Sequence, residues 1–147
     1  MVDVGAKEAT RRTAVAEGRL VTEPATVALL QEGGGPKGDA LAVARVAGIQ
    51  GAKRTADLIP LCHPLPLDRV EVEVEADPAL PGVRVRATAS ATARTGVEME
   101  ALSAVSAALL TAYDMLKSLD RGMHIEGIRL LRKEGGRSGT WIREDQD

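Results

Sequence analysis

The clearest hydrophobic pattern in the chain is a strict alternation over residues 69–76, RVEVEVEA. It places three valines on one side of an extended segment and three glutamates on the other. After the turn DPALPG, residues 83–93 alternate again, and Arg84 and Arg86 fall on the outer side, where they can oppose the glutamates. The two segments predict a β-hairpin whose outer face is either a solvated ladder of opposite charges or a subunit interface.

Helical periodicity is strongest over residues 98–120, where apolar residues recur at alternating intervals of three and four. This stripe predicts a long helix that faces the sheet. A shorter helix is expected after residues 22–24, a Thr-Glu-Pro cap with proline in the first turn. The spacing of apolar residues over 37–55 predicts another helix, which Gly48 and Gly51 weaken.

Weaker alternation over residues 11–22 and 124–133 predicts two further strands. The order of elements is then strand, two helices, two strands, helix and strand. This elaborated βαββαβ pattern predicts an α+β, ferredoxin-like fold, an antiparallel sheet with helices on one face. The length predicts a single domain, 1–147, with a mobile N-terminal arm at 1–10 and a flexible C-terminal tail at 135–147.

Composition narrows the classes of function. The chain has a net charge of −2 and two aromatic residues, Tyr113 and Trp141, whereas nucleic-acid-binding surfaces are commonly basic and carry aromatic platforms. A single cysteine makes no internal disulfide, and no leader or long apolar run is visible, so we expect a cytoplasmic protein with no membrane or nucleic-acid partner. A core without phenylalanine and an open sheet face, which we expect to be apolar, favour an oligomer.

Residues 58–67, LIPLCHPLPL, contain the cysteine and a histidine among three prolines. Because each proline lacks a backbone donor and favours an extended predecessor, the segment is predicted to be a stiff connector. Cys62 and His63 then point to opposite sides, which disfavours a nucleophile and base pair. Two histidines and one cysteine are too few for a structural zinc site, and no metal site is predicted. His63 is either an ordinary loop residue or a ligand-binding one.

Asp114 and Lys117 are three residues apart on the long predicted helix and share a face, as an ordinary surface ion pair also does. Glu100 precedes Asp114 by almost four turns, so it lies near the same stripe but about 21 Å away. One pocket of one chain cannot hold both carboxylates. If both serve the same ligand, two subunits must supply them across a two-fold contact.

Four segments together carry a resemblance to a known family. They are MVDVGAK, KGDALAVARVAGIQGAKRTADLIPLCHPL, TGVEMEALSAVSAALLTAYDMLKSLD and IRLLRKEGGRSG, and they cover nearly the whole chain. They closely resemble the cyclic pyranopterin monophosphate synthase family, molybdenum cofactor biosynthesis protein C. LIPLCHPL, GVEMEAL and YDMLK in this order are highly specific. The resemblance implies a ferredoxin-like lyase of molybdenum cofactor (molybdopterin) biosynthesis.

The resemblance also implies the reaction and the assembly. The substrate would be 3′,8-cyclo-7,8-dihydro-GTP, which is converted to cyclic pyranopterin monophosphate with release of pyrophosphate. The implied assembly is a homohexamer, a trimer of dimers, with active sites at the dimer interfaces. A radical SAM GTP cyclase would be the upstream pathway partner. No cofactor is implied, and whether Mg²⁺ accompanies the triphosphate stays open.

The resemblance assigns functions to twelve residues. It implies Lys/Asp acid–base catalysis by Asp114 and Lys117. The residues that match substrate-binding positions are Leu61, Cys62, His63, Met99, Glu100, Glu98, Lys53, Lys133, Lys37 and Arg12. We expect Lys37, Lys53 and Lys133 to converge on the triphosphate as point charges. We also expect the prolines to hold the residues around His63 rigidly against a flat ring system, with Cys62 as a small wall residue.

Two other functions fit parts of the sequence. A regulatory small-molecule-binding domain of the same fold would need no acid–base pair, so replacing Asp114 would leave its function intact. An RNA-binding module that uses the open sheet would place aromatic residues on the hairpin strands, and residues 69–93 contain none.

Overall fold

The computed structural model of the protein describes residues 1–145, and the described chain has the order of long elements that the sequence predicts. Along the chain these elements are β1 (Thr10–Val21), α1 (Pro24–Gln31), α2 (Ala40–Lys53), α3 (Thr55–Leu58), β2 (Arg69–Asp77), β3 (Gly82–Ala93), α4 (Glu98–Leu116), β4 (His124–Glu134) and β5 (Trp141–Ile142). The short helix α3 and the two-residue strand β5 are additions to the prediction.

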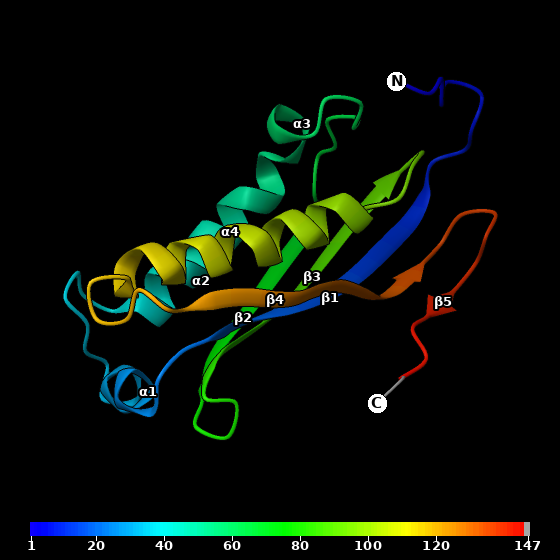
Figure 1. The fold of residues 1–147 in the computed structure, drawn as a ribbon. Coiled ribbons are helices and arrows are strands. Elements are labelled where there is room, and N and C mark those ends of the chain that lie inside the picture. The colour runs from blue at the N-terminus through cyan, green and yellow to red at the C-terminus, as the bar shows by residue number, and fades with distance from the viewer. Residues whose placement is uncertain (146–147) are drawn as a thin grey trace.

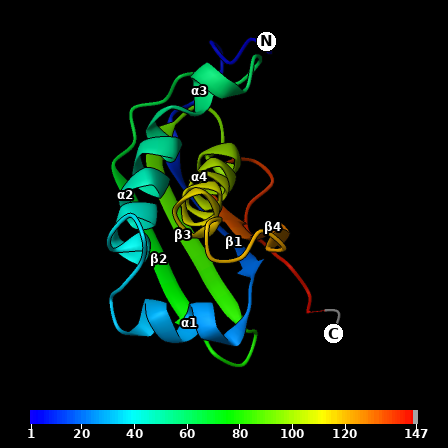
Figure 2. The same cartoon turned by 60° about the vertical axis from the view of Figure 1, so that its left-hand side comes forward.

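The strands form one antiparallel sheet in the order β2-β3-β1-β4-β5. Helices α2 and α4 lie side by side on one face of this sheet, and α1 lies across one end of it (Figures 1 and 2). The α+β, ferredoxin-like prediction is therefore confirmed. The connection through α3 and the proline-rich loop returns the chain from α2 to β2, the outermost strand of the hairpin.

The face of the sheet away from the helices is charged. The strand register places Glu73 opposite Arg86, Arg86 opposite Glu17, and Glu17 opposite Arg129, so charges alternate in sign across four strands. Arg129 Nη2 also lies 3.2 Å from Glu17 Oε1. The predicted opposition of arginines and glutamates in the hairpin is thus confirmed, whereas the expectation of an apolar open face is wrong, because each of the four strands places charged residues on it.

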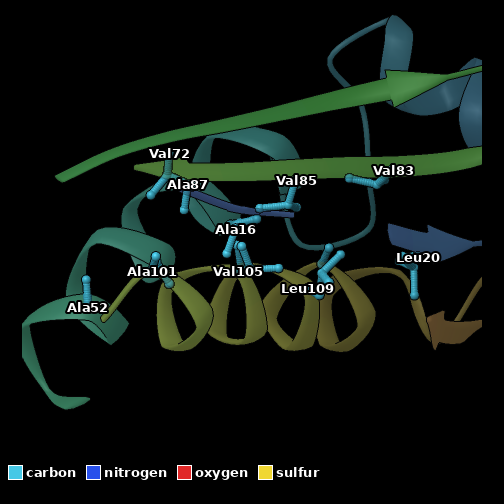
Figure 3. Close-up of a cluster of buried hydrophobic side chains, with 14 of the residues drawn as sticks. Ala16, Leu20, Ala52, Val72, Val83, Val85, Ala87, Ala101, Val105 and Leu109 are labelled. Atoms are coloured by element: carbon cyan, nitrogen blue, oxygen red, sulfur yellow. The ribbon is translucent and has the colours of Figure 1, made fainter. Parts of the chain in front are cut away.

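The core lies between the helices and the sheet and consists mainly of alanine, valine and leucine side chains (Figure 3). Alternation along β1 buries Ala16 and Leu20 beneath α4, where Val105 and Leu109 meet them. Gly18 lies between them, and a Cβ there would be 2.8 Å from Leu109 Cδ1. The small residues of β1 therefore allow α4 to approach the sheet closely.

The contact between α2 and α4 depends on two glycines. A Cβ at Gly51 would lie 2.6 Å from Ala107 Cβ and 3.0 Å from Ser103 O, and one at Gly48 would lie 3.0 Å from Ala104 O. Neither position has space for a side chain, because the facing atoms include the backbone of α4. The glycines that weaken α2 as an isolated helix are therefore what lets the two helices pack.

Replacing Gly51 by valine is expected to lower the stability of the fold by about 3 kcal/mol, because the new side chain overlaps α4. Thermal and urea unfolding at fixed protein concentration measures this loss. Gln50→Val, at the adjacent exposed position of the same helix, is the matched control and is expected to change stability little. Equal stability of the two variants would show that α2 can move away from α4 without cost.

Two element boundaries differ from the prediction, the end of α4 and the start of α1. The helix ends at Leu116 rather than near residue 120, and Leu119 is 43% exposed instead of buried. The Leu119 and Asp120 N–H groups both donate to Leu116 O and close a turn, and Thr22 Oγ1 donates a hydrogen bond to Asp120 Oδ2 at 2.8 Å. Thr22 therefore does not cap α1, whose N-cap is Glu23 without a side-chain hydrogen bond.

The N-terminal arm leads into the start of β1 (Figure 1). In the arm, Asp3 Oδ1 accepts a hydrogen bond from the Gly5 N–H at 2.8 Å, and the Lys7 N–H donates to Val4 O at 3.1 Å. Strand β5 pairs Trp141 with Lys133 of β4. Residues 146 and 147 of the predicted tail lie outside the described residues. Mobility of the arm and tail, and the single-domain organisation, remain predictions.

Helix α4 has the length and hydropathy of a membrane-spanning segment, and no other helix within residues 1–145 does. Of that segment, 56% is buried inside the fold. It packs on the sheet through Val105 and Leu109, which is the behaviour of a core helix.

Candidate active site

The first cluster of expected site residues lies where α4 begins, next to the loop that follows α3. Leu61, Cys62 and His63 of this loop line a cavity of about 410 Å³, together with Glu98 and Met99 of α4. The Cys62 N–H donates to Ile59 O at 3.1 Å and closes a turn that contains Pro60. The structure thus brings five of the expected substrate-binding residues around one cavity.

Glu100 is the buried carboxyl group of this cluster. It is only 2% exposed, and its Oε1 has no hydrogen-bond partner among the described residues. Burial, followed by the charge of nearby Glu98, raises the pKa of Glu100. A smaller cavity of about 120 Å³ lies between Glu100 and the expected phosphate-binding residue Lys53. An unpartnered buried carboxyl oxygen is costly for the fold and is typical of a site that awaits hydrogen-bond donors from a ligand.

Glu100→Gln is expected to raise the melting temperature at pH 7 to 8 and to change it little near pH 4. The folded state raises the pKa of Glu100, so its carboxyl holds a proton more tightly when folded, and stability falls as pH rises between the unfolded and folded pKa values. Glutamine removes this loss, which we expect to be about 1 kcal/mol.

Thermal melting of both proteins across this pH range measures the effect. Glu32→Gln, at an exposed position just after α1 and remote from Glu100, is the control for the loss of one negative charge. A gain of equal size at pH 4 would mean that the charge of Glu100 is not what limits stability.

Cys62 faces Glu100 rather than His63. Its Sγ lies 3.9 Å from Glu100 Oε2, and burial, followed by the Glu100 charge, raises the pKa of the thiol. A thiol with a raised pKa stays protonated near neutral pH and is a poor nucleophile. This agrees with the sequence argument against a Cys62–His63 nucleophile pair and with Cys62 as a wall residue.

The second cluster lies at the opposite end of α4. Lys117 Nζ donates to Asp114 Oδ1 at 2.8 Å, and Lys37 Nζ donates to Asp114 Oδ2 at 3.0 Å. Lys37 reaches Asp114 from the loop between α1 and α2, which Figure 1 shows beside the end of α4. The hydrogen bonds from Lys117 and then Lys37 lower the pKa of Asp114, so the carboxylate is ionised at neutral pH. All three side chains are about half exposed, so the group is open to a ligand or a second chain.

Arg12 and Lys133 lie in neighbouring strands at the end of the sheet where α4 begins. Arg12 is 7% exposed, and its Nε donates to Ala93 O at 3.3 Å. Lys133 Nζ donates to Gly135 O at 3.3 Å and contacts Ser138 Oγ in the loop after β4. Both residues are therefore near the first cluster and remote from Asp114.

The three lysines expected on a triphosphate do not converge within one chain. Lys37 is held on Asp114, while Lys53 and Lys133 lie toward the other end of α4. About 21 Å of helix separates Glu100 from Asp114. The site residues of one chain form two separate groups, as the spacing on the helix predicts.

Sequence reasoning missed the contribution of the N-terminal arm. Val2, Val4 and Lys7 line the same cavity as Leu61 and His63. Their sequence has no periodicity and led us to expect only a mobile arm. The one available signal was that MVDVGAK belongs to the segments that carry the family resemblance.

Within residues 1–145, no group of three or more His, Cys, Asp or Glu side chains is arranged to hold a metal ion. The first cluster instead offers the Glu100 carboxyl group, whose pKa is raised, with the Arg12 guanidinium group nearby. The second offers the Asp114 carboxylate between two lysine ammonium groups. Such groups can bind anionic ligands and move protons.

The fold and the two clusters define an α+β enzyme with preformed cavities for a small molecule. The model of the MoaC family matches residues 1–136. Similar proteins include one from Methylobacterium sp. (strain 4-46), 62% identical over 141 residues, which cover 96% of this chain and 88% of the relative. One from Cereibacter sphaeroides is 63% identical over 141 residues, with 96% and 89% covered. One from Thermomicrobium roseum is 58% identical over 147 residues, with 100% and 89% covered.

Each of these three relatives bears the name cyclic pyranopterin monophosphate synthase. The chain therefore belongs to the MoaC family, and the predicted family is confirmed. It is a lyase of molybdenum cofactor biosynthesis.

Proposed function

We propose that this chain is a cyclic pyranopterin monophosphate synthase. It converts 3′,8-cyclo-7,8-dihydro-GTP to cyclic pyranopterin monophosphate and releases pyrophosphate. The names of the relatives support the reaction. The presence in one chain of an open Asp–Lys pair, of the cavity beside His63 and of a smaller cavity between the buried Glu100 carboxyl group and Lys53 supports a small, polar, anionic substrate.

The observation that carries the proposal is the separation of these two groups by the length of α4. Within residues 1–145, neither Asp114 nor Lys117 lines the cavity beside His63 or the one beside Lys53, and no lysine is hydrogen-bonded to Glu100. The active site is complete when the Asp114 end of one subunit meets the Glu100 end of another.

In this site the cavity beside His63 holds the ring system, and the Glu100 carboxyl group accepts hydrogen bonds from ring N–H groups. Asp114 is ionised and accepts a proton, and Lys117 donates one. The α-phosphorus forms a new P–O bond to a substrate hydroxyl group, and the bond to the bridging oxygen of the β-phosphate breaks. The hydroxyl proton leaves through the acid–base pair. Substrate atoms equal those of product and pyrophosphate, so no oxidant or reductant is needed.

The proposed assembly is a homohexamer, a trimer of dimers with active sites at the dimer interfaces. Exposed apolar side chains on the outer sides of α2 and α4 support contacts between subunits: Val46 is 66% and Leu110 62% exposed. We further propose a cytoplasmic location and an upstream radical SAM GTP cyclase that supplies the substrate.

Incubating the purified protein with 3′,8-cyclo-7,8-dihydro-GTP tests the function directly. Mass spectrometry should identify cyclic pyranopterin monophosphate, and ³¹P NMR should show one equivalent of pyrophosphate. Parallel reactions with MgCl₂ and with EDTA decide whether Mg²⁺ accompanies the triphosphate. Recovery of unchanged substrate in both reactions, with a correctly folded protein, would refute the proposal.

A further inference from the structure

Cys62 lies between the two cavities of the first cluster. It lines the cavity beside His63, whereas Glu100 lines the smaller cavity beside Lys53 and does not line the first. The Cys62 Sγ is 3.9 Å from Glu100 Oε2, which is hydrogen-bond distance for sulfur. Among the described residues, this thiol is the only side chain hydrogen-bonded to the Glu100 carboxyl group. The thiol therefore links the wall of the larger cavity to the buried carboxyl group behind it.

The Glu100 carboxyl group has one oxygen with a partner and one without. Oε2 meets the Cys62 thiol, and Oε1 has no hydrogen-bond partner within residues 1–145, although the residue is only 2% exposed. The terminal torsion of a glutamate side chain is soft, so its covalent structure does not decide which way the carboxyl plane faces. A donor on Oε2 restricts this rotation and leaves Oε1 as the oxygen that a ligand has to satisfy.

Both ends of this contact are held by well-fixed backbone. The turn closed by the Cys62 N–H fixes the cysteine, and the rings of Pro60 and Pro64 on either side set the φ angles of the loop. Glu100 lies in the first turn of α4, next to Ala101, which is 0% exposed. Because neither backbone has to be ordered when a ligand arrives, the contact is available in the free chain.

The protonation of the two groups decides which one donates. An ionised carboxylate only accepts hydrogen bonds, so the thiol is the donor. Burial, followed by the charge of Glu100, raises the pKa of the Cys62 thiol, so the thiol keeps its proton near neutral pH. The other charged groups that face the carboxylate are Glu98, on the same helix, and Lys53 and Asp57, across the smaller cavity. None of these three is hydrogen-bonded to it among the described residues. The orientation of the carboxylate therefore depends on Cys62.

We propose that Cys62 is a positioning residue: its thiol donates a hydrogen bond to Glu100 Oε2 and holds the carboxylate so that Oε1 is free to accept from the substrate. Cysteine suits this place because its small apolar body also forms part of the wall beside His63. The inference rests on the proposed function for the identity of the substrate. The contact itself rests on the geometry of the free chain.

Thiol titration tests the contact without substrate. Cys62 is the only cysteine, so the rate of alkylation by iodoacetamide as a function of pH measures this thiol alone. Glu100→Gln should lower the thiol pKa and speed alkylation at pH 7 about fivefold, because the acceptor loses its charge. Glu32→Gln removes the same charge at an exposed position just after α1 and should change neither value. Equal thiol pKa values in the wild type and Glu100→Gln would overturn the inference.

A double-mutant cycle separates positioning from packing. Cys62→Ala should weaken binding of cyclic pyranopterin monophosphate about fivefold, and Cys62→Ser, which keeps a donor, should restore most of the affinity. In the Glu100→Gln background the same alanine substitution should have no further effect, because Cys62 acts through the carboxylate. Equilibrium dialysis of the four proteins measures these affinities. Additive effects of Cys62→Ala and Glu100→Gln would overturn the inference and leave Cys62 as a wall residue only.

The pH profile of kcat/KM provides a third measurement. Its acid limb should move to higher pH in Cys62→Ala, since the ionised carboxylate has lost a donor, and Cys62→Ser should move it back. Thr95→Ala is the matched control, because Thr95 lines the same cavity and is not hydrogen-bonded to Glu100 among the described residues. Its acid limb should equal that of the wild type. A lowered thiol pKa in Glu100→Gln, in a protein that does not convert the nucleotide, would refute the proposed function and leave the thiol–carboxylate contact standing.

Discussion

Lys117→Ala is expected to reduce turnover by on the order of 10³-fold and to leave substrate affinity nearly unchanged. Lys117 Nζ is held 2.8 Å from Asp114 Oδ1, so the pair is placed for proton transfer, and its contribution arises mainly in the transition state. Single-turnover rates give the chemical step, and anaerobic equilibrium dialysis with the same substrate gives the dissociation constant of the inactive variant.

Lys53→Ala is the matched comparison for Lys117→Ala. Lys53 lines the small cavity beside Glu100 and has no described carboxylate partner at hydrogen-bond distance. Its loss should weaken binding more than it slows the chemical step, because a charge on a phosphate group stabilises bound substrate and transition state alike. If Lys117→Ala behaves in this way, with full turnover at saturating substrate, then Lys117 belongs to the phosphate-binding residues and Asp114 lacks its proposed proton donor.

Mixing two inactive proteins, Glu100→Ala and Asp114→Ala, is expected to restore activity once their subunits exchange. In a mixed dimer one pocket receives both substitutions and the other receives neither, because each pocket takes Glu100 and Asp114 from different chains. Random exchange of an equimolar mixture makes half of the dimers mixed. Recovery should therefore approach about one quarter of wild-type activity if the pockets act independently.

Asp114→Ala mixed with Lys117→Ala is the matched control. Both substitutions affect the same end of α4, so in a mixed dimer each pocket contains one of them and no activity should return. Mass spectrometry of intact assemblies confirms that chains have exchanged. Exchanged but inactive mixtures of Glu100→Ala and Asp114→Ala would contradict the two-subunit site.

The sequence predicts the hairpin and the long helix well, because strict alternation over 69–76 and a three-four repeat over 98–116 have few other structural solutions. It does not predict where α4 ends, and the turn after it contacts a part of the chain far away in sequence, through the hydrogen bond from Thr22 to Asp120. It also wrongly predicts an apolar outer face of the sheet. The pairing of Glu17 with Arg129 on that face follows from the register of the strands, which the sequence does not give.

For the candidate site, the sequence identifies the separation of Glu100 from Asp114, because helical rise is fixed. It does not predict that Lys37 is held by Asp114, since that contact crosses from a glycine-rich loop to the end of α4. The role of the arm is equally inaccessible. That Lys7 lines the cavity beside His63 is known only once the arm is seen to fold back toward that cavity.

Helix α4 fixes both the distance and the angle between its two chemical ends. Inserting one residue between Glu100 and Asp114 would move them apart by about 1.5 Å and rotate one about the axis by about 100° relative to the other. No single insertion or deletion restores the original direction; the shortest near-restoring change is about seven residues, which alters the length by about 10 Å. The interval is therefore constrained as a unit: side chains along α4 can be exchanged one at a time, but a change in the number of residues alters both the distance and the direction between Glu100 and Asp114.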